Sequence, residues 1–86
     1  MKLDERIIRL IAVGASITAN CEPCLETNVS KAMENGADAQ EIAEAIEIGK
    51  MVRKGAASKM DMFAAGLNAV SVAGASAAAR TCECGL

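Results

Sequence analysis

The sequence predicts a small, all-α domain of about four helices. Apolar residues recur at helical spacing along most of the 86-residue chain, which is long enough for one domain. Gly36 and Gly55 follow two of these segments, at positions where a left-handed residue commonly ends a helix. No stretch shows the alternation of apolar and polar residues that indicates a half-buried strand.

The first two predicted helices span residues 3–20 and residues 22–35. In the first, Ile7, Ile11 and other apolar residues share one face. The second begins with Glu-Pro, because the missing N–H of proline is no loss in a first helical turn. Gly36 is expected to end this second helix in a left-handed conformation.

The third predicted helix opens with a capping box between Asp38 and Glu41 and ends at Gly55. The fourth spans residues 58–79 and opens with a similar capping pattern at Ser58. Because glycine lowers helix stability relative to alanine, the glycines inside this Ala-rich segment indicate close packing against a neighbouring helix.

The expected domain comprises residues 1–79, followed by an irregular tail at residues 80–86. Hydrophobic residues make up 52% of the chain, yet Phe63 is its one aromatic residue. The core must therefore consist of Ala, Ile, Leu, Val and Met. The excess of small apolar residues predicts that part of the apolar surface is covered by another copy of the chain.

Charge and hydropathy argue against two classes of partner. The net charge of −2, with acidic and basic residues interspersed, argues against a nucleic acid. The most apolar N-terminal segment, residues 7–19, contains Arg9 and is too short to span a bilayer. Asp4 and Glu5 precede it, where a signal peptide would be positively charged. We therefore expect no membrane partner and a cytoplasmic location.

Cys21 and Cys24 are the main chemical feature of the sequence. Their spacing places both thiols on one face of a helix, near enough to form a disulfide with little backbone movement. The N–H groups and the dipole at a helix start favour an anion, which would lower the pKa of a thiol there. Glu22 and Glu26 would oppose this effect if their carboxylates lie near a sulfur.

Several uses of the cysteines stay open on sequence grounds. The first pair could pack as small apolar residues, form a static disulfide, or act in redox chemistry. The second pair, Cys82 and Cys84, could form a strained disulfide, exchange with the first pair, or be incidental. All four thiolates, from Cys21, Cys24, Cys82 and Cys84, could also hold zinc or an iron–sulfur cluster.

Three motifs in a fixed order resemble the core of the carboxymuconolactone decarboxylase and alkylhydroperoxidase D family. They are ANCEPCLETN at residues 19–28, KAMENGA at residues 31–37 and EIAEA at residues 41–45. The resemblance covers residues 4–67. It implies an all-helical fold that forms trimers or hexamers. It also implies that the dithiol cycles between reduced and disulfide states, with Cys24 attacking a peroxide and Cys21 exchanging disulfides with a partner protein.

The sequence departs from the family pattern at two positions near the dithiol. Active members usually carry a histidine where this chain has Asn28, and an acidic residue where it has Arg9; the whole chain contains no histidine. Asn28, the third candidate catalytic residue, can donate a hydrogen bond to a thiolate but cannot accept a proton. Arg9 is interpreted as a solvated helix-face residue, or as a charge that stabilises the thiolate if it turns toward the site.

These observations predict a dithiol–disulfide oxidoreductase with weak alkyl hydroperoxide reductase activity and no cofactor. The expected partners are other copies of the chain and a thiol- or disulfide-bearing protein. Two alternatives remain: a zinc or iron–sulfur binding module that uses all four cysteines, and a non-catalytic oligomeric member of the family.

Overall fold

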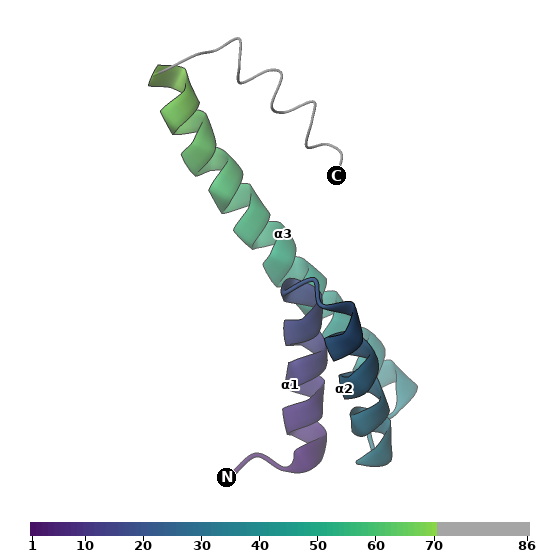
Figure 1. The fold of residues 1–86 in the computed structure, drawn as a ribbon. Helices are drawn as coiled ribbons and strands as arrows, with labels where there is room; N and C mark the ends of the chain where they lie inside the picture. Colours follow the sequence, from purple (N-terminus) through teal and green to yellow (C-terminus); the bar gives the residue numbers. More distant parts are fainter. Residues whose placement is uncertain (71–86) are drawn as a thin grey trace. The chain divides into compact units, whose positions relative to one another are not determined.

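The computed structural model describes the backbone of residues 1–70 and the side chains of residues 1–67. Three helices occupy most of this part of the chain: α1 (Glu5–Thr18), α2 (Glu22–Glu34) and α3 (Ala39–Val70). α1 and α2 form an antiparallel hairpin whose helices pack side by side (Figure 1). No strand occurs among residues 1–70, so the predicted all-α class is confirmed.

The chain divides into two compact units. The first comprises Met1–Gly55 and contains α1, α2 and the first half of α3. The second begins at Ala56, and its described part is the remainder of α3. The predicted boundary after residue 79 lies outside the described residues and stays a prediction.

The helix ends follow local sequence signals. Asp4 caps α1, since its Oδ1 accepts the backbone N–H of Ile7 at 2.9 Å. At the end of α2, Gly36 has a φ of 95°, and a Schellman pair of backbone bonds follows the helix. Gly36 therefore ends α2 as predicted.

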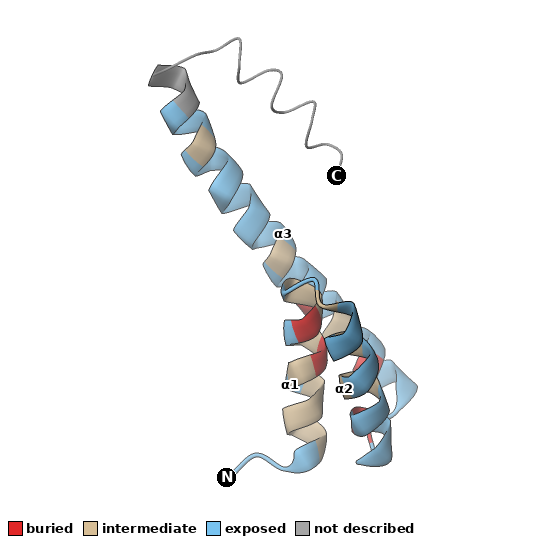
Figure 2. Cartoon of the chain, in the orientation of Figure 1, coloured by how far each residue is buried: buried red, intermediate tan, exposed pale blue. Residues whose placement is uncertain are grey.

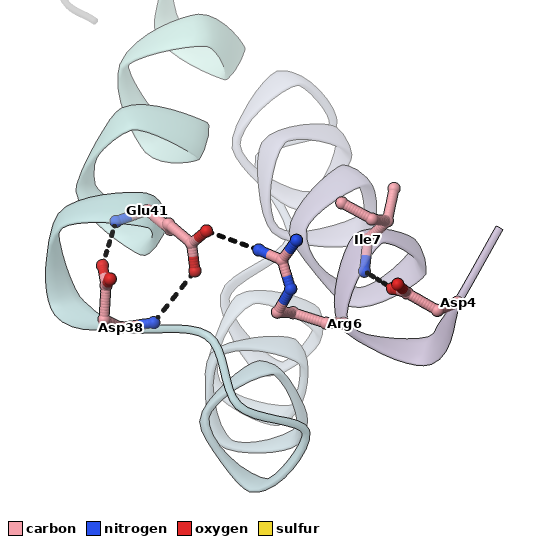
Figure 3. A network of polar contacts seen from close by, with 5 residues as sticks. All are labelled: Asp4, Arg6, Ile7, Asp38 and Glu41. Atoms are coloured by element: carbon pink, nitrogen blue, oxygen red, sulfur yellow. Dashed lines mark hydrogen bonds and ion pairs between the residues drawn. The ribbon is translucent and has the colours of Figure 1, made fainter.

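The predicted capping box at the start of α3 is confirmed. The N–H of Glu41 donates to Asp38 Oδ1 at 2.8 Å, and the N–H of Asp38 donates to Glu41 Oε1 at 3.1 Å. The second oxygen of Glu41 pairs with the guanidinium of Arg6 on α1 (Figure 3). One carboxylate therefore both caps α3 and ties its first turn to α1.

The predicted break between a third and a fourth helix is wrong. α3 continues through Gly55 and through Ser58, so the described chain has three helices rather than the predicted four. The surrounding residues are mostly Ala, Lys and Met, which are good helix formers, and the chain's one proline lies elsewhere, at position 23. One glycine costs a helix about 1 kcal/mol relative to alanine, which is too little to stop it in this context.

The core of the first unit is small and aliphatic (Figure 2). Its buried hydrophobic residues are Val13, Ala32, Ala37 and Ile42. Four methionines for which the sequence predicts packing or interface roles lie outside this core and are exposed: Met33, Met51, Met60 and Met62. Flexible methionine chains thus contribute to the surface, whereas Val, Ala and Ile fill the interior.

α1 and α3 approach closely at a pair of glycines. A Cβ atom on Gly14 would lie 3.1 Å from the carbonyl oxygen of Ala45. A Cβ atom on Gly49 would collide with the carbonyl oxygen of Gly14 and lie 2.8 Å from Cβ of Ile17. The hydroxyl of Thr18 donates to the carbonyl oxygen of Gly49 at 3.1 Å. The two backbones therefore touch without intervening side chains.

Candidate redox site

Cys21 takes part in the ends of two helices. α1 ends in a Schellman motif, in which Asn20 has a φ of 55° and donates its N–H to the carbonyl of Ile17 at 3.1 Å. The N–H of Cys21 completes the motif by donating to the carbonyl of Ser16 at 3.0 Å. Cys21 is also the N-cap of α2, because its Sγ accepts the N–H of Cys24 at 3.3 Å.

A disulfide joins Cys21 and Cys24, whose Cα atoms are 5.3 Å apart. The proximity predicted from their spacing is therefore confirmed. Cys24 is exposed, whereas Cys21 is half-buried in the turn. Glu22 and Glu26, the two acidic neighbours, are also exposed, so water screens their charges. The pair thus lies at the surface and at the positive end of the α2 dipole.

Arg53 on α3 holds the residue that precedes the dithiol, a contact that the sequence did not indicate. Its Nη1 donates to Asn20 Oδ1 at 2.9 Å and to the carbonyl of Ile17 at 3.3 Å. Asparagine adopts a positive φ more readily than most other non-glycine residues, so Asn20 carries a local signal for this turn. Nothing local connects it to an arginine 33 residues later.

Arg9 on α1 and Asn28 on α2 meet beside the dithiol. Arg9 Nη1 donates to Asn28 Oδ1 at 3.0 Å, and its Nε donates to Glu5 Oε2 at 3.1 Å. The interpretation of Arg9 as a solvated helix-face residue is therefore wrong, because its guanidinium bridges two helices and its side chain is 31% exposed.

Asn28 contacts the backbone of Cys24 and lies one helical turn after it. Asn28 Nδ2 donates to the carbonyl oxygen of Cys24 at 2.9 Å and lies 3.5 Å from Ser16 Oγ. In this disulfide-bonded state the amide is thus directed at a carbonyl and a hydroxyl. Its predicted role as a catalytic residue that donates to a thiolate stays a prediction.

An apolar groove of about 620 Å³ lies between α1 and α3, within the first unit. Its large exposed apolar residues are Ile11, Ile48 and Val52, and the charged residues Arg6 and Glu41 also line it. Neither cysteine of the disulfide lines it. The groove and the dithiol are therefore separate features of this unit.

Cys82 and Cys84 lie outside the described residues. The exchange between the two cysteine pairs, the four-thiolate site and its zinc or iron–sulfur cluster therefore stay predictions. Within residues 1–70, the side chains of His, Cys, Asp and Glu form no group of three that could hold a metal ion. In the same part of the chain, no helix combines the length and apolar character needed to cross a bilayer.

Comparison with known proteins identifies the family of the chain. A sequence model of the carboxymuconolactone decarboxylase family matches residues 1–83, which is almost the whole chain. Searches of curated proteins and of solved structures found no match. The matched range includes every element described above, from the cap of α1 through the dithiol to the end of the described part of α3. The chain belongs to the carboxymuconolactone decarboxylase family.

Proposed function

We propose that the chain is a dithiol–disulfide oxidoreductase that works through Cys21 and Cys24. One observation carries the proposal: the two sulfurs form a disulfide at the surface-exposed start of α2, where Cys21 Sγ accepts the N–H of Cys24. In the reduced protein this N–H and the helix dipole favour an anionic sulfur. We therefore expect the pKa of the Cys21 thiol to lie below the ordinary value of about 8.5.

The proposed reaction transfers two electrons from the dithiol to a disulfide of a partner protein. The Cys21 thiolate attacks one sulfur of that disulfide, which breaks the partner's S–S bond and forms a mixed disulfide. Cys24, as a thiolate, then attacks Cys21 Sγ and releases the partner's second thiolate. The cysteine pair is oxidised, the partner becomes a dithiol, and the two protons lost by the pair balance those taken up by the partner.

A weak alkyl hydroperoxide reductase activity is part of the proposal. Cys24, the more exposed cysteine, attacks the peroxide oxygen and becomes a sulfenic acid while an alcohol leaves; Cys21 then closes the disulfide and releases water. The chain has no histidine, and the amide of Asn28 cannot accept a proton. No imidazole is therefore available to move the protons, so we expect peroxide reduction to be slower than disulfide exchange.

A redox titration tests the proposed function. In a Cys82→Ser/Cys84→Ser variant, Cys21 and Cys24 are the two cysteines that remain. Equilibration with glutathione or dithiothreitol buffers, followed by thiol labelling, is expected to give one reversible two-electron transition. We expect its midpoint between about −270 and −120 mV at pH 7, the range of redox-active CxxC proteins. A pair that stays oxidised below about −300 mV would be a structural disulfide and would refute the function.

We also propose that a second copy of this chain covers the groove between α1 and α3, in a trimer or hexamer. The first unit buries four hydrophobic residues, whereas Ile11, Ile48 and Val52 each expose more than half of their surface along the groove. A core this small leaves little stability to a short chain unless further apolar surface is buried.

Light scattering on an Ile48→Glu variant tests this self-association. We expect wild-type protein to be oligomeric and the variant to dissociate, because a charge would be buried in the contact. Met33 supplies a matched control, since it is similarly exposed but lies on α2, outside the groove. Met33→Glu is expected to leave the oligomer intact. A monomeric wild-type protein, or equal dissociation of both variants, would contradict the proposal.

A further inference from the structure

The backbone of each cysteine is hydrogen-bonded to one further residue, Cys21 to Ser16 and Cys24 to Asn28. The N–H of Cys21 donates to the carbonyl of Ser16 at 3.0 Å, and the carbonyl of Cys24 accepts Asn28 Nδ2 at 2.9 Å. The same Nδ2 lies 3.5 Å from Ser16 Oγ. Ser16 is buried, with 5% exposure, and its hydroxyl donates to the carbonyl of Ala12 at 2.7 Å. Ser16 on α1 thus bonds directly to Cys21 and contacts the side chain that holds Cys24.

Arg9 determines which way the amide of Asn28 faces. A guanidinium can only donate hydrogen bonds, so the group that meets Arg9 Nη1 at 3.0 Å must be the amide oxygen. The amide NH₂ then faces the carbonyl of Cys24 and the hydroxyl of Ser16. Glu5 in turn accepts a hydrogen bond from Arg9 Nε, and its carboxylate offsets the charge of the guanidinium. A flipped amide would place its oxygen against the carbonyl of Cys24 and its NH₂ against Arg9.

We infer that Arg9 is a positioning residue of the dithiol, which acts through Asn28. This inference rests on the proposed disulfide exchange. Closing the disulfide fixes the backbone at both cysteines, which has an entropic cost. The bonds to Ser16 and Asn28 hold this backbone in the closed geometry before the sulfurs join, so less entropy is lost in the step that makes the S–S bond. Arg9 thereby shifts the exchange equilibrium toward the Cys21–Cys24 disulfide. The two electrons released by this oxidation reduce the disulfide of the partner protein.

A double-mutant cycle on the equilibrium with glutathione tests the inference. The background is Cys82→Ser/Cys84→Ser, so that one pair titrates. Arg9→Met keeps the aliphatic part of the side chain but removes its charge and donors, and is expected to lower the oxidation constant about fivefold to tenfold. Asn28→Ala is expected to lower it at least as much. Because Arg9 acts through Asn28, the double variant should match Asn28→Ala alone.

Two further variants separate positioning from charge and from general stability. Arg9→Lys keeps the charge but replaces the planar, forked donor, so it should restore only part of the constant. Lys50→Met removes an equal charge from α3, where exposed Lys50 pairs with Glu47 and does not line the groove. This control is expected to leave the constant unchanged. The side-chain NH₂ resonances of Asn28 should shift in Arg9→Met and stay in place in Lys50→Met.

The outcomes of these experiments distinguish a failure of the inference about Arg9 from a failure of the proposed disulfide exchange. A reversible wild-type pair with additive effects of Arg9→Met and Asn28→Ala would overturn the inference alone. Full restoration by Arg9→Lys would also overturn it, because charge and not geometry would then act on the pair. A wild-type pair that does not titrate reversibly would overturn the proposed function and this inference together.

Discussion

Replacement of Cys24 with serine is expected to stop turnover in disulfide exchange and to trap the partner on Cys21. The wild-type pair resolves the mixed disulfide within one molecule, since the Cα atoms of the two cysteines are 5.3 Å apart. Intramolecular attack of this kind has effective concentrations of millimolar or more, so its loss should slow turnover by about 100-fold or more. Serine leaves the start of α2 intact, because it differs from cysteine by one atom.

The measurement combines the release of both aromatic thiolates from an aromatic disulfide by pre-reduced protein, with no other thiol added, and mass spectrometry of the trapped adduct. The Cys82→Ser/Cys84→Ser background ensures that no other thiol of the chain resolves it. Cys21→Ser in the same background is the matched control and should form little adduct, because the thiolate stabilised at the helix start is absent. Equal trapping by both variants, or normal turnover of Cys24→Ser, would contradict the assigned roles.

Replacement of Gly49 with alanine is expected to lower the free energy of unfolding by about 2 kcal/mol. The added Cβ would collide with the backbone oxygen of Gly14 and lie 2.8 Å from Cβ of Ile17. Backbone atoms cannot rotate away, so α1 and α3 would have to separate, and the bond from Thr18 to the Gly49 carbonyl would lengthen or break. Urea unfolding followed by far-UV circular dichroism measures the change.

Gly55 provides the opposite prediction on the same helix. An added Cβ there meets nothing within 4 Å, and the residue lies inside α3. Gly55→Ala should therefore raise the free energy of unfolding by about 0.5–1 kcal/mol, through helix propensity and reduced freedom of the unfolded chain. Both variants must be compared at one protein concentration, because self-association adds to apparent stability. A neutral Gly49→Ala would show that the two helices separate freely at this point.

Sequence patterns that involve residues a few positions apart predicted the local structure correctly at three places. Asp38 and Glu41 form the expected capping box, Gly36 ends α2, and the CxxC spacing brings its sulfurs together. Each of these depends on residues a few positions apart, for which sequence spacing determines spatial distance. The sequence therefore sufficed for the approximate bounds of α1 and α2 and for the position of the dithiol between them.

Contacts between residues far apart in the chain could not be predicted from the sequence. Arg9 meets Asn28 across 19 positions, and Arg53 meets Asn20 across 33. No local pattern specifies either pair, because each depends on how whole helices pack. The error at Gly55 has the opposite origin, since a local stop signal was weaker than the helix propensity of the residues on both sides.

Cys21 contributes its N–H to the end of α1 and its sulfur to the beginning of α2. The chemical environment of the sulfur therefore exists only once the hairpin has formed. In an unfolded or newly synthesised chain, both cysteines would behave as ordinary thiols, with neither the helix dipole nor the anchoring carbonyl of Ser16 to distinguish them. Thiol reactivity at this turn thus reports on whether the hairpin is assembled. The dithiol acquires its redox chemistry in the same event in which the chain acquires its tertiary structure.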